Sequence, residues 1–334
     1  MLVEGRVIPG FFYARSRRIW VYPSWTIIIP VKPGGDVRAI ESLREMDYPR
    51  NLVEIIVSEG CRPSSQRNRA VAAAAGELLY FLDDDSQVKP DFLQKAASHY
   101  VDPHVAVVGG PSLTPRSDTV LQQAFGAALS SLIGGGSVRN RYRLAGSTRS
   151  TAENELILCN LSFRREIYLA CGGLDERLYP NEENELMDRI LHNGWELIHD
   201  PDLAVMRSQR RRYQDFVRQL FTYGRGRGEQ THVSRKINLA SLVPSLFLLY
   251  LMMAPFLDNP VYTLPLLCYA GAVAITALWE ALQRQMALLF PLLLISIPTL
   301  HLAYGAGMLV GLARPRFRDS GKSPAEVQLR RVEL

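Results

Sequence analysis

The sequence predicts a domain of α/β class with a largely parallel sheet, followed by a region of apolar helices that spans a membrane. Continuous apolar β-branched runs, of which Trp25–Val31 is the first, suit buried parallel strands. Segments of helical character separate these runs, as in βαβ units. Nearer the carboxyl terminus, the stretch 238–313 carries only three charged side chains, which are Asp258, Glu280 and Arg284.

Strands and helices alternate through the first part of the α/β domain. We expect strands at about residues 25–31, 52–58, 78–82 and 105–108. Helices are expected at about 36–46, 66–75 and 90–100. Asp36 is the expected N-cap of the first helix, because it follows the turn formed by residues 33–35.

The second part of the domain contains a segment without a clear strand or helix pattern. Residues 116–154 hold three consecutive glycines among many serines and arginines, and we expect a mobile loop with one helix inside it. The remaining elements are a strand at 156–163, helices at 165–170 and 183–192, and short strands at 196–198 and 203–206.

The apolar stretch divides into three pieces, at about 239–257, 261–281 and 286–313. Each piece is close to the ~20 residues that cross the hydrocarbon of a bilayer. A buried helical domain is the alternative, but the scarcity of charge and the basic flanks favour the membrane. The flanking residues are Arg207, Arg210, Arg211, Arg212, Arg218, Arg225, Arg227, Arg235 and Lys236 on one side, and Arg314, Arg316, Arg318 and Lys322 on the other.

The same charges bear on the number of membrane crossings. The loop at 258–260 has no positive charge and is expected to face outward. Three full crossings would then place Arg314 and its basic neighbours outside, against the positive-inside rule. An even number of crossings fits better, with one piece re-entrant or interfacial. Pro291 and Pro298 make the last piece a candidate for a broken helix.

Five regions follow from these patterns. They are an N-terminal extension at 1–23, either an arm at the membrane interface or an irregular extension; the α/β domain at 24–212; an amphipathic interfacial segment at 213–237; transmembrane helices at 238–313; and a cytoplasmic basic tail at 314–334. Net charge is +5, but no motif combines aromatic and basic residues, so nucleic acid is not an expected partner. The four cysteines form no C-x-x-C pair and are expected to be reduced.

The strongest chemical signal is the run Asp83, Asp84 and Asp85 at the end of the third expected strand. Ligands of parallel α/β sheets collect at the carboxyl ends of strands. Two like charges ~4 Å apart repel by about 4 kcal/mol at a moderate effective dielectric, and a divalent cation removes that cost. Carboxylate oxygens suit Mg²⁺ or Mn²⁺, which can bridge to a diphosphate. A solvated acidic turn is the alternative interpretation of the same triplet.

A second group of chemically informative residues lies between positions 164 and 189. Gly172 and Gly173 allow a tight turn and a close backbone approach to a ligand. Glu182 and Glu183 open a helix, where the helix dipole favours negative charge, and one of them is a candidate general base. Ordinary acidic charge at a helix N-terminus is the alternative.

Taken in order, these segments resemble the family 2 glycosyltransferases, whose fold is called GT-A, a Rossmann-like mixed sheet that serves transferases of nucleotide-diphospho-sugars. The resemblance rests on the strands WTIIIPV and VEIIVSEG, the block QRNRAV…AAGELLYFLDDDS, the stretch CNLSFRREIYLACGGLDERLYPNEENEL and the segment RQLFTYGRGRG. The apolar helices that follow are similar to those of membrane-anchored members, which extend bacterial surface polysaccharides or lipid-linked glycans.

The resemblance implies a role for each matched position. Glu183 corresponds to the catalytic base, and Asp85 and Asp83 correspond to the metal site for Mg²⁺ or Mn²⁺. The implied donor-binding residues are Pro30, Glu59, Arg67, Asn68, Asp83, Asp84, Arg207 and Arg211. Within that set, Glu59 stands where the family has an acid that binds the nucleotide base.

Several departures from the family pattern qualify these roles. The usual Asp near the base is Glu59, and a Glu-Asp pair is replaced by Glu182 and Glu183, which leaves open which of the two is the base. Arg207 stands where many members have a histidine, which favours a phosphate contact over a metal ligand. Processive members carry a Q-x-x-R-W signature, but the arginine is absent after Gln219, so single additions are favoured.

The sequence thus predicts a metal-dependent, inverting, single-addition hexosyltransferase of the inner membrane with its catalytic domain in the cytoplasm. Its expected partners are a nucleotide-diphosphate sugar donor, a polyprenyl-linked or glycan acceptor, and membrane lipid. A nucleotidyltransferase and a catalytically inactive membrane scaffold are the alternatives. The identities of the sugar, the nucleotide and the acceptor stay open.

Overall fold

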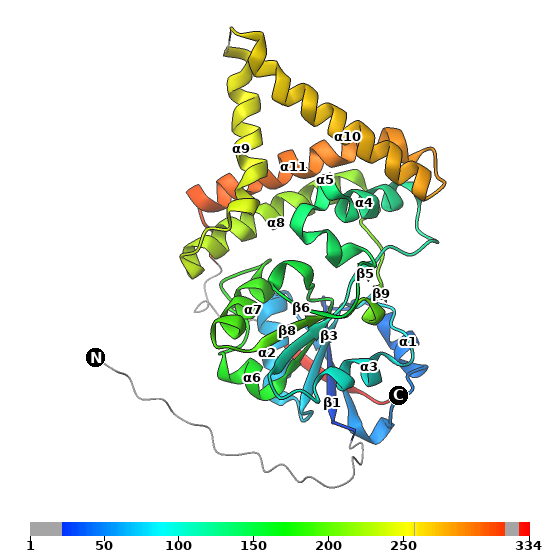
Figure 1. The fold of residues 1–334 in the computed structure, drawn as a ribbon. Coiled ribbons are helices and arrows are strands. Elements are labelled where there is room, and N and C mark those ends of the chain that lie inside the picture. The colour runs from blue at the N-terminus through cyan, green and yellow to red at the C-terminus, as the bar shows by residue number, and fades with distance from the viewer. Residues whose placement is uncertain (1–21, 257, 318–326) are drawn as a thin grey trace, which may run out of the picture.

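The structure of the chain, a computed structural model, describes residues 22–256, 258–317 and 327–334. Most of the expected N-terminal extension at 1–23 therefore lies outside the described residues. A mixed sheet of eight strands forms the centre of the α/β domain, in the order β10-β2-β1-β3-β7-β4-β8-β6 (Figure 1). This architecture confirms the predicted fold class.

The inner strands of this sheet run parallel. β1 (Trp25–Val31) pairs in parallel with β2 (Val53–Glu59) on one side and with β3 (Leu78–Leu82) on the other. Their carboxyl ends therefore meet at one edge. β3 pairs antiparallel with β7 (Asn160–Arg164). Beyond β7 lie β4 (Val105–Gly109), β8 (Glu196–His199) and β6 (Arg149–Thr151), and β5 (Ser112–Leu113) pairs with β9 (Val205–Met206) in a separate small sheet.

Helices cover both faces of the sheet because the β1 side chains alternate between two buried clusters. Ile27 and Ile29 pack with α1 (Ala39–Arg44) and α3 (Phe92–His99). Ile28 packs in the cluster on the other face. The helices of that face are α2 (Pro63–Ala73), α6 (Arg165–Ala170) and α7 (Glu182–His192). One local prediction was wrong: α1 begins after Arg38 without a side-chain cap, and Asp36 is not its N-cap.

The segment 116–154 is not the mobile loop that its glycines predicted. It contains α4 (Val120–Ser130), α5 (Leu132–Gly135), a 3₁₀ helix at Gly136–Tyr142 and strand β6. α4 begins with a capping box between Thr119 and Gln122. Its alanines pack against the long apolar helices that follow, so tertiary contacts order the segment.

Four long helices follow the sheet, and they are α8 (Tyr213–Ser234), α9 (Leu239–Met253), α10 (Leu264–Gln283) and α11 (Leu289–Ala313). Figure 1 shows α9 and α10 as a hairpin that extends away from the α/β domain, whereas α8 and α11 run between that hairpin and the domain. Three segments, 239–256, 260–283 and 289–313, are long and apolar enough to cross a membrane. The expectation of a broken last helix was wrong, because α11 is one helix with Pro298 inside it.

The chain returns to the sheet at its carboxyl end. The expected basic tail at 314–334 includes β10 (Gln328–Val332), which pairs antiparallel with β2 and adds an edge strand. Val332 and Leu334 pack against the apolar cluster that holds Ile27 and Ile29. These two apolar residues, which alternate along the chain, help to bind the strand, and a count of basic residues did not reveal this.

Candidate active site

The candidate site lies at the carboxyl ends of the parallel strands. The three consecutive aspartates follow β3 directly, and Glu59 is the last residue of β2. The loop after β1 approaches the same edge, because the Gly34 N–H donates to Oε1 of Glu59 at 3.0 Å and the Ala39 N–H donates to the Asp84 carbonyl at 3.0 Å. The topology therefore brings together most of the residues predicted from the sequence.

Asp83 is held between two arginines. Arg207 Nη1 lies 2.7 Å from Oδ2 of Asp83, and Arg67 Nη2 lies 3.4 Å from Oδ1. Both arginine side chains are largely buried, at 14% and 7% exposed, where charge pairing is screened little by solvent. Both carboxylate oxygens of Asp83 are therefore engaged, which leaves Asp85 as the more available of the two predicted metal ligands.

Asp84 and Asp85 carry unfavourable charge. Burial raises the pKa of the Asp84 carboxyl, and the neighbouring Asp85 and Asp83 raise it further. Burial also raises the pKa of Asp85, and Asp83 adds to this, although Arg207 and Arg38 act in the opposite direction. A bound cation would favour the ionised forms of both acids, so the charges around Asp84 and Asp85 fit a divalent ion.

The chemistry of the available ligands narrows the kind of metal site. Among the described residues, no group of three or more His, Cys, Asp or Glu side chains is arranged to hold a metal ion. A closed structural zinc site is therefore absent from the part of the chain that the structure describes. Mg²⁺ and Mn²⁺ need one or two protein carboxylates when a substrate's phosphates supply further oxygens, and Asp85 fits that role.

The two candidate base residues differ in their surroundings. Glu182 begins α7 and is buried, and its Oε1 lies 3.3 Å from Arg67 Nη1. Arg67 thus connects Glu182 with Asp83. Glu183 is partly exposed and makes no hydrogen bond or ion pair with any residue that the structure describes. Glu182 therefore positions Arg67, whereas Glu183 has a carboxylate free to meet a substrate.

Three further predicted donor contacts, Asn68, Arg211 and Pro30, differ in their surroundings. The amide of Asn68 is fully used within the protein: its nitrogen donates to Leu174 and Glu176, and its oxygen accepts from Tyr168 and the Leu174 N–H. Asn68 therefore holds the turn at 172–176 in place and is not free for phosphates. Arg211 is exposed and makes no ion pair among the described residues. Pro30 lies within β1, opposite Ser58 of β2.

Sequence reasoning missed Arg38, whose Nη2 lies 4.0 Å from Oδ2 of Asp85. Its position in the sequence could have indicated this role. Arg38 lies seven residues after the end of β1, and the segment after β1 passes the same sheet edge as the aspartates after β3. Arg38 is exposed, so it can turn toward an anionic ligand.

A buried ionic cluster joins α8 to the site. Arg227 of α8 pairs with Glu153 (Nη1–Oε1, 3.0 Å), and Arg141 pairs with the same carboxylate at 3.3 Å. Arg141 also donates to Oδ1 of Asn184 at 2.7 Å, in the first turn of α7. Beside this cluster, burial and the charge of Glu153 raise the pKa of Asp188 to about 6. Arg227 is therefore buried inside the protein. It does not lie on the membrane surface, where the amphipathic interpretation of 213–237 had placed it.

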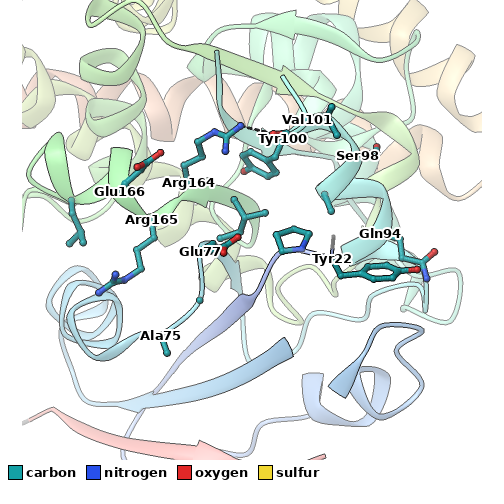
Figure 2. A pocket seen from close by; sticks show the side chains of 15 residues that line it. Tyr22, Ala75, Glu77, Gln94, Ser98, Tyr100, Val101, Arg164, Arg165 and Glu166 are labelled. Carbon is teal, nitrogen blue, oxygen red and sulfur yellow. Dashed lines mark hydrogen bonds between the residues drawn. The ribbon is translucent and has the colours of Figure 1, made fainter. Parts of the chain in front are cut away.

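A cavity of ≈ 990 Å³ lies at the other end of the strands (Figure 2). It is lined by Gly76 and Leu78 at the start of β3 and by Arg164 and Arg165 at the end of antiparallel β7. None of the predicted site residues lines it. The cavity is therefore distinct from the candidate site at the carboxyl edge.

Sequence comparison identifies similar proteins. Residues 34–167 match the model of the family described as glycosyl transferase family 2. The pre-mycofactocin glycosyltransferase of Mycobacterium tuberculosis is 28% identical over 162 residues, which are 48% of this chain and 33% of that protein. The chain thus spans about a third of that curated relative. The succinoglycan biosynthesis protein ExoA of Rhizobium meliloti is 23% identical over 318 residues, 84% of this chain and 92% of that protein.

Structural comparison agrees with the sequence. Mannosyltransferase PcManGT from Pyrobaculum calidifontis, solved in complex with GDP-Man and Mn²⁺, superposes with a TM-score of 0.54 at 17% identity and covers 88% of each chain. At this level of identity the similarity shows the fold alone.

Proposed function

We propose that this chain, whose residues 34–167 form a family 2 glycosyl transferase domain within a GT-A fold, transfers a sugar from a nucleotide-diphosphate donor to an acceptor at a membrane surface. One observation carries the proposal: Asp85 stands at the tip of β3 beside an Asp83 that Arg67 and Arg207 hold in place. Acid and cationic groups of this kind, at the carboxyl edge of a parallel sheet, suit a diphosphate and its counter-ion.

The cationic side chains of the site serve the leaving group. Arg207 and Arg67 are held near β3 by Asp83, and their Nε atoms are buried without a hydrogen-bond partner among the described residues. Guanidinium groups suit phosphate oxygens, and positive charge fixed before the reaction stabilises the nucleoside diphosphate as it leaves. A Mg²⁺ or Mn²⁺ ion held at Asp85 would neutralise further charge on the diphosphate.

Glu183 is the proposed catalytic base. It accepts the proton of an acceptor hydroxyl, and the oxygen of that hydroxyl attacks the anomeric carbon as the bond from that carbon to the phosphate oxygen breaks. Direct attack from the face opposite the leaving group inverts the configuration. The first turn of α7 supports this role, because Asn184 is fixed by Arg141 and Glu182 is fixed by Arg67, on either side of Glu183.

The proposed acceptor is a lipid-linked glycan, and the proposed location is the cytoplasmic face of the inner membrane. Three apolar segments and the similarity to ExoA over most of both chains support a membrane enzyme of polysaccharide synthesis. Residues 210–212 are exposed arginines just before α8, where they can contact phosphate groups at a membrane surface. The absence of a Q-x-x-R-W signature supports single additions.

A panel of nucleotide sugars tests this function. The full-length protein in detergent or nanodiscs is expected to release nucleoside diphosphate from one donor when Mn²⁺ and a polyprenyl-linked acceptor are both present. Asp85→Ala is expected to lose binding of that donor. The variant should still show a cooperative thermal unfolding transition, which indicates that its fold is intact. Use of a nucleoside triphosphate with release of pyrophosphate would instead indicate a nucleotidyltransferase, and absence of any nucleotide binding would indicate a scaffold.

A further inference from the structure

The carboxyl-terminal strand β10 lies at the same sheet edge as the candidate site. β10 pairs antiparallel with β2, and the register places Gln328 directly opposite Glu59, the last residue of β2. In an antiparallel pair, directly opposite residues project to the same face with Cβ atoms ~5 Å apart. Two polar side chains that are far apart in the sequence therefore meet at the carboxyl edge of the sheet.

The position of β10 is fixed by several contacts. Arg331 Nε donates to Oε1 of Glu54 at 2.7 Å, and Arg331 Nη2 donates to the Ala73 carbonyl at 3.0 Å. Arg50 Nη1 donates to the carbonyl of Leu334 at 2.7 Å, and Leu334 packs against the apolar cluster beneath it. Gln328 is therefore held in register, although its own side chain is exposed.

The strand order indicates which part of a donor reaches this edge. The proposed diphosphate site is at the tip of β3, and the candidate base residues begin α7, which packs on β8, beyond β7 from β3. The reacting sugar must therefore lie on the β7 side of β3. The nucleoside then extends the other way, across β1 to β2 and β10, which are two and three strand spacings of ~4.8 Å from β3.

We propose that Gln328 of β10, together with Glu59, reads the base of the nucleotide donor. This inference rests on the proposed function. The Glu59 carboxylate only accepts hydrogen bonds, whereas the Gln328 amide both donates and accepts. Side by side, they match the polar edge of a nucleobase, where an N–H stands next to a carbonyl oxygen or a ring nitrogen.

The surroundings leave both groups able to bind a base. Glu59 keeps Oε2 free of any hydrogen bond among the described residues, since its one contact is from the Gly34 N–H to Oε1. Gln328 makes no side-chain hydrogen bond within the part of the chain that the structure describes. The last residues of the chain are then part of the donor site, and they set its preference among nucleotides.

Binding measurements on the full-length protein test this role. UDP, GDP, ADP and CDP are titrated with Mn²⁺ into wild type, Gln328→Ala and a matched control, Leu329→Ala, whose side chain projects from the same strand to the other face. Gln328→Ala is expected to weaken the preferred nucleotide about 5-fold, the effect of one lost hydrogen bond. Pyrophosphate with Mn²⁺, which has no base, should bind wild type and variant equally, and Leu329→Ala should bind like wild type.

The outcomes separate the inference from the function on which it rests. Wild type that binds none of the four nucleotides contradicts the proposed function itself. Wild type that binds a nucleotide, with Gln328→Ala binding it equally well and with the same base preference, overturns the role of Gln328. Equal weakening of nucleotide and pyrophosphate also overturns it, since the strand would then act on the whole site. A second variant, Gln328→Glu, removes the donor and sets a like charge against Glu59, so it should weaken the preferred nucleotide at least as much as Gln328→Ala.

Discussion

Neighbouring aspartates at the tip of β3 have different tasks because their partners differ. Asp83 is neutralised by Arg67 and Arg207, and it orients both of them. The ion pair of Asp85 among the described residues is a long one, to Arg38 at 4.0 Å, and burial raises the pKa of Asp85 although the charges of Arg207 and Arg38 oppose this. The first aspartate therefore organises the cationic side of the site, and the other supplies charge to a bound metal ion.

This division predicts that Asp85→Asn stabilises the metal-free protein. A carboxyl with a raised pKa in the folded state binds its proton more tightly there than in the unfolded chain, so the free energy of unfolding falls as pH rises through that pKa. At about pH 7 the charge is a cost that asparagine removes, and we expect an unfolding midpoint about 2 °C higher. Mn²⁺ should raise the midpoint of wild type but not of the variant.

Thermal unfolding at several pH values checks this prediction. The difference between wild type and Asp85→Asn should narrow toward pH ~4, where an ordinary aspartate takes up its proton. Ser98→Ala, at an exposed position on α3, is a control expected to behave as wild type. A variant that is less stable than wild type at neutral pH without metal would contradict the prediction.

The two acids at the start of α7 predict different kinetic effects. Glu183→Gln should lower kcat by a factor of ~10²–10⁴, the usual contribution of a general base, and leave the affinity for the nucleotide unchanged. Glu182→Gln removes one of the two charged partners of Arg67, so it should weaken donor binding as well as turnover. The measurements are steady-state kinetics and nucleotide titration on the same preparations. Turnover that survives Glu183→Gln and is lost with unchanged donor binding in Glu182→Gln would exchange the two roles.

At the scale of elements, glycines set how closely α8 and α11 approach. A Cβ on Gly307 would lie 2.0 Å from the carbonyl oxygen of Phe221, and a Cβ on Gly224 would lie 2.0 Å from that of Tyr304. Gly228 and Gly311 show the same crowding against the facing backbone. Small residues spaced four apart on both helices thus allow backbone contact, as at helix pairs in membranes.

Gly307→Ala should therefore separate the two helices and destabilise the protein. Overpacking of this kind costs about 1–3 kcal/mol, and the obstacle here is backbone, which cannot move aside as a side chain does. Gly271→Ala on α10 is the matched control, because nothing lies within 4 Å of its added Cβ. Thermal unfolding and limited proteolysis in detergent measure the effect. Equal stability of the two variants would mean that α8 and α11 do not make this contact.

Periodicity and turn signals predicted elements better than they predicted the contacts between them. The strand at 78–82 and the helix at 165–170 have the bounds that the sequence predicted, because local apolar patterns specify them. The order of 116–154 was missed, since α4 is stabilised by α10 and α11, which lie more than a hundred residues away in the chain. β10 was missed for a similar reason, because a five-residue strand rich in arginine has no pattern of its own.

The candidate site was predicted to a comparable extent. The aspartates after β3 and the acids of α7 were found because strand ends and helix starts are visible in a sequence. The pairing of Asp83 with two arginines was not predicted. Arg67, Arg207 and Asp83 come from three separate segments, and their spacing in the chain does not determine their distance in space. The use of all polar atoms of Asn68 within the protein likewise depends on a turn that only the fold positions.

At the scale of the whole molecule, both ends of the helical region are attached to the same α/β domain. α8 enters the region and is joined to the site through Arg227 and Glu153, and β10 leaves it as a strand of the sheet. A chain that starts and ends on one side of a membrane crosses it an even number of times. Three candidate segments therefore cannot all cross.

The contacts indicate which segment does not cross. At the end of α10, Arg284 Nη2 donates to the Ser130 hydroxyl of α4 at 3.0 Å, so the chain is back beside the α/β domain before α11 begins. At the end of α11, the Arg316 N–H donates to Oε1 of Glu229 in α8 at 2.8 Å. In mid-helix, His301 contacts the Ile133 carbonyl of α5 at 2.9 Å. α11 thus contacts the domain side at several points along its length. We propose that α9 and α10, which extend away from the α/β domain (Figure 1), are the pair that crosses the membrane.

We therefore predict that the loop at 258–260 is reached from outside the cell and that the loop after α10 is not. Asn259→Cys and Ala287→Cys are matched exposed sites, to be placed in a protein whose four cysteines are replaced by serine. A membrane-impermeant maleimide applied to intact cells should label the first variant only, and both should be labelled after lysis. A reporter fused after Leu334 should be active only in the cytoplasm. Labelling of Ala287→Cys from outside, or an external carboxyl terminus, would require α11 to cross, and β10 could then not pair with β2 in a cytoplasmic domain.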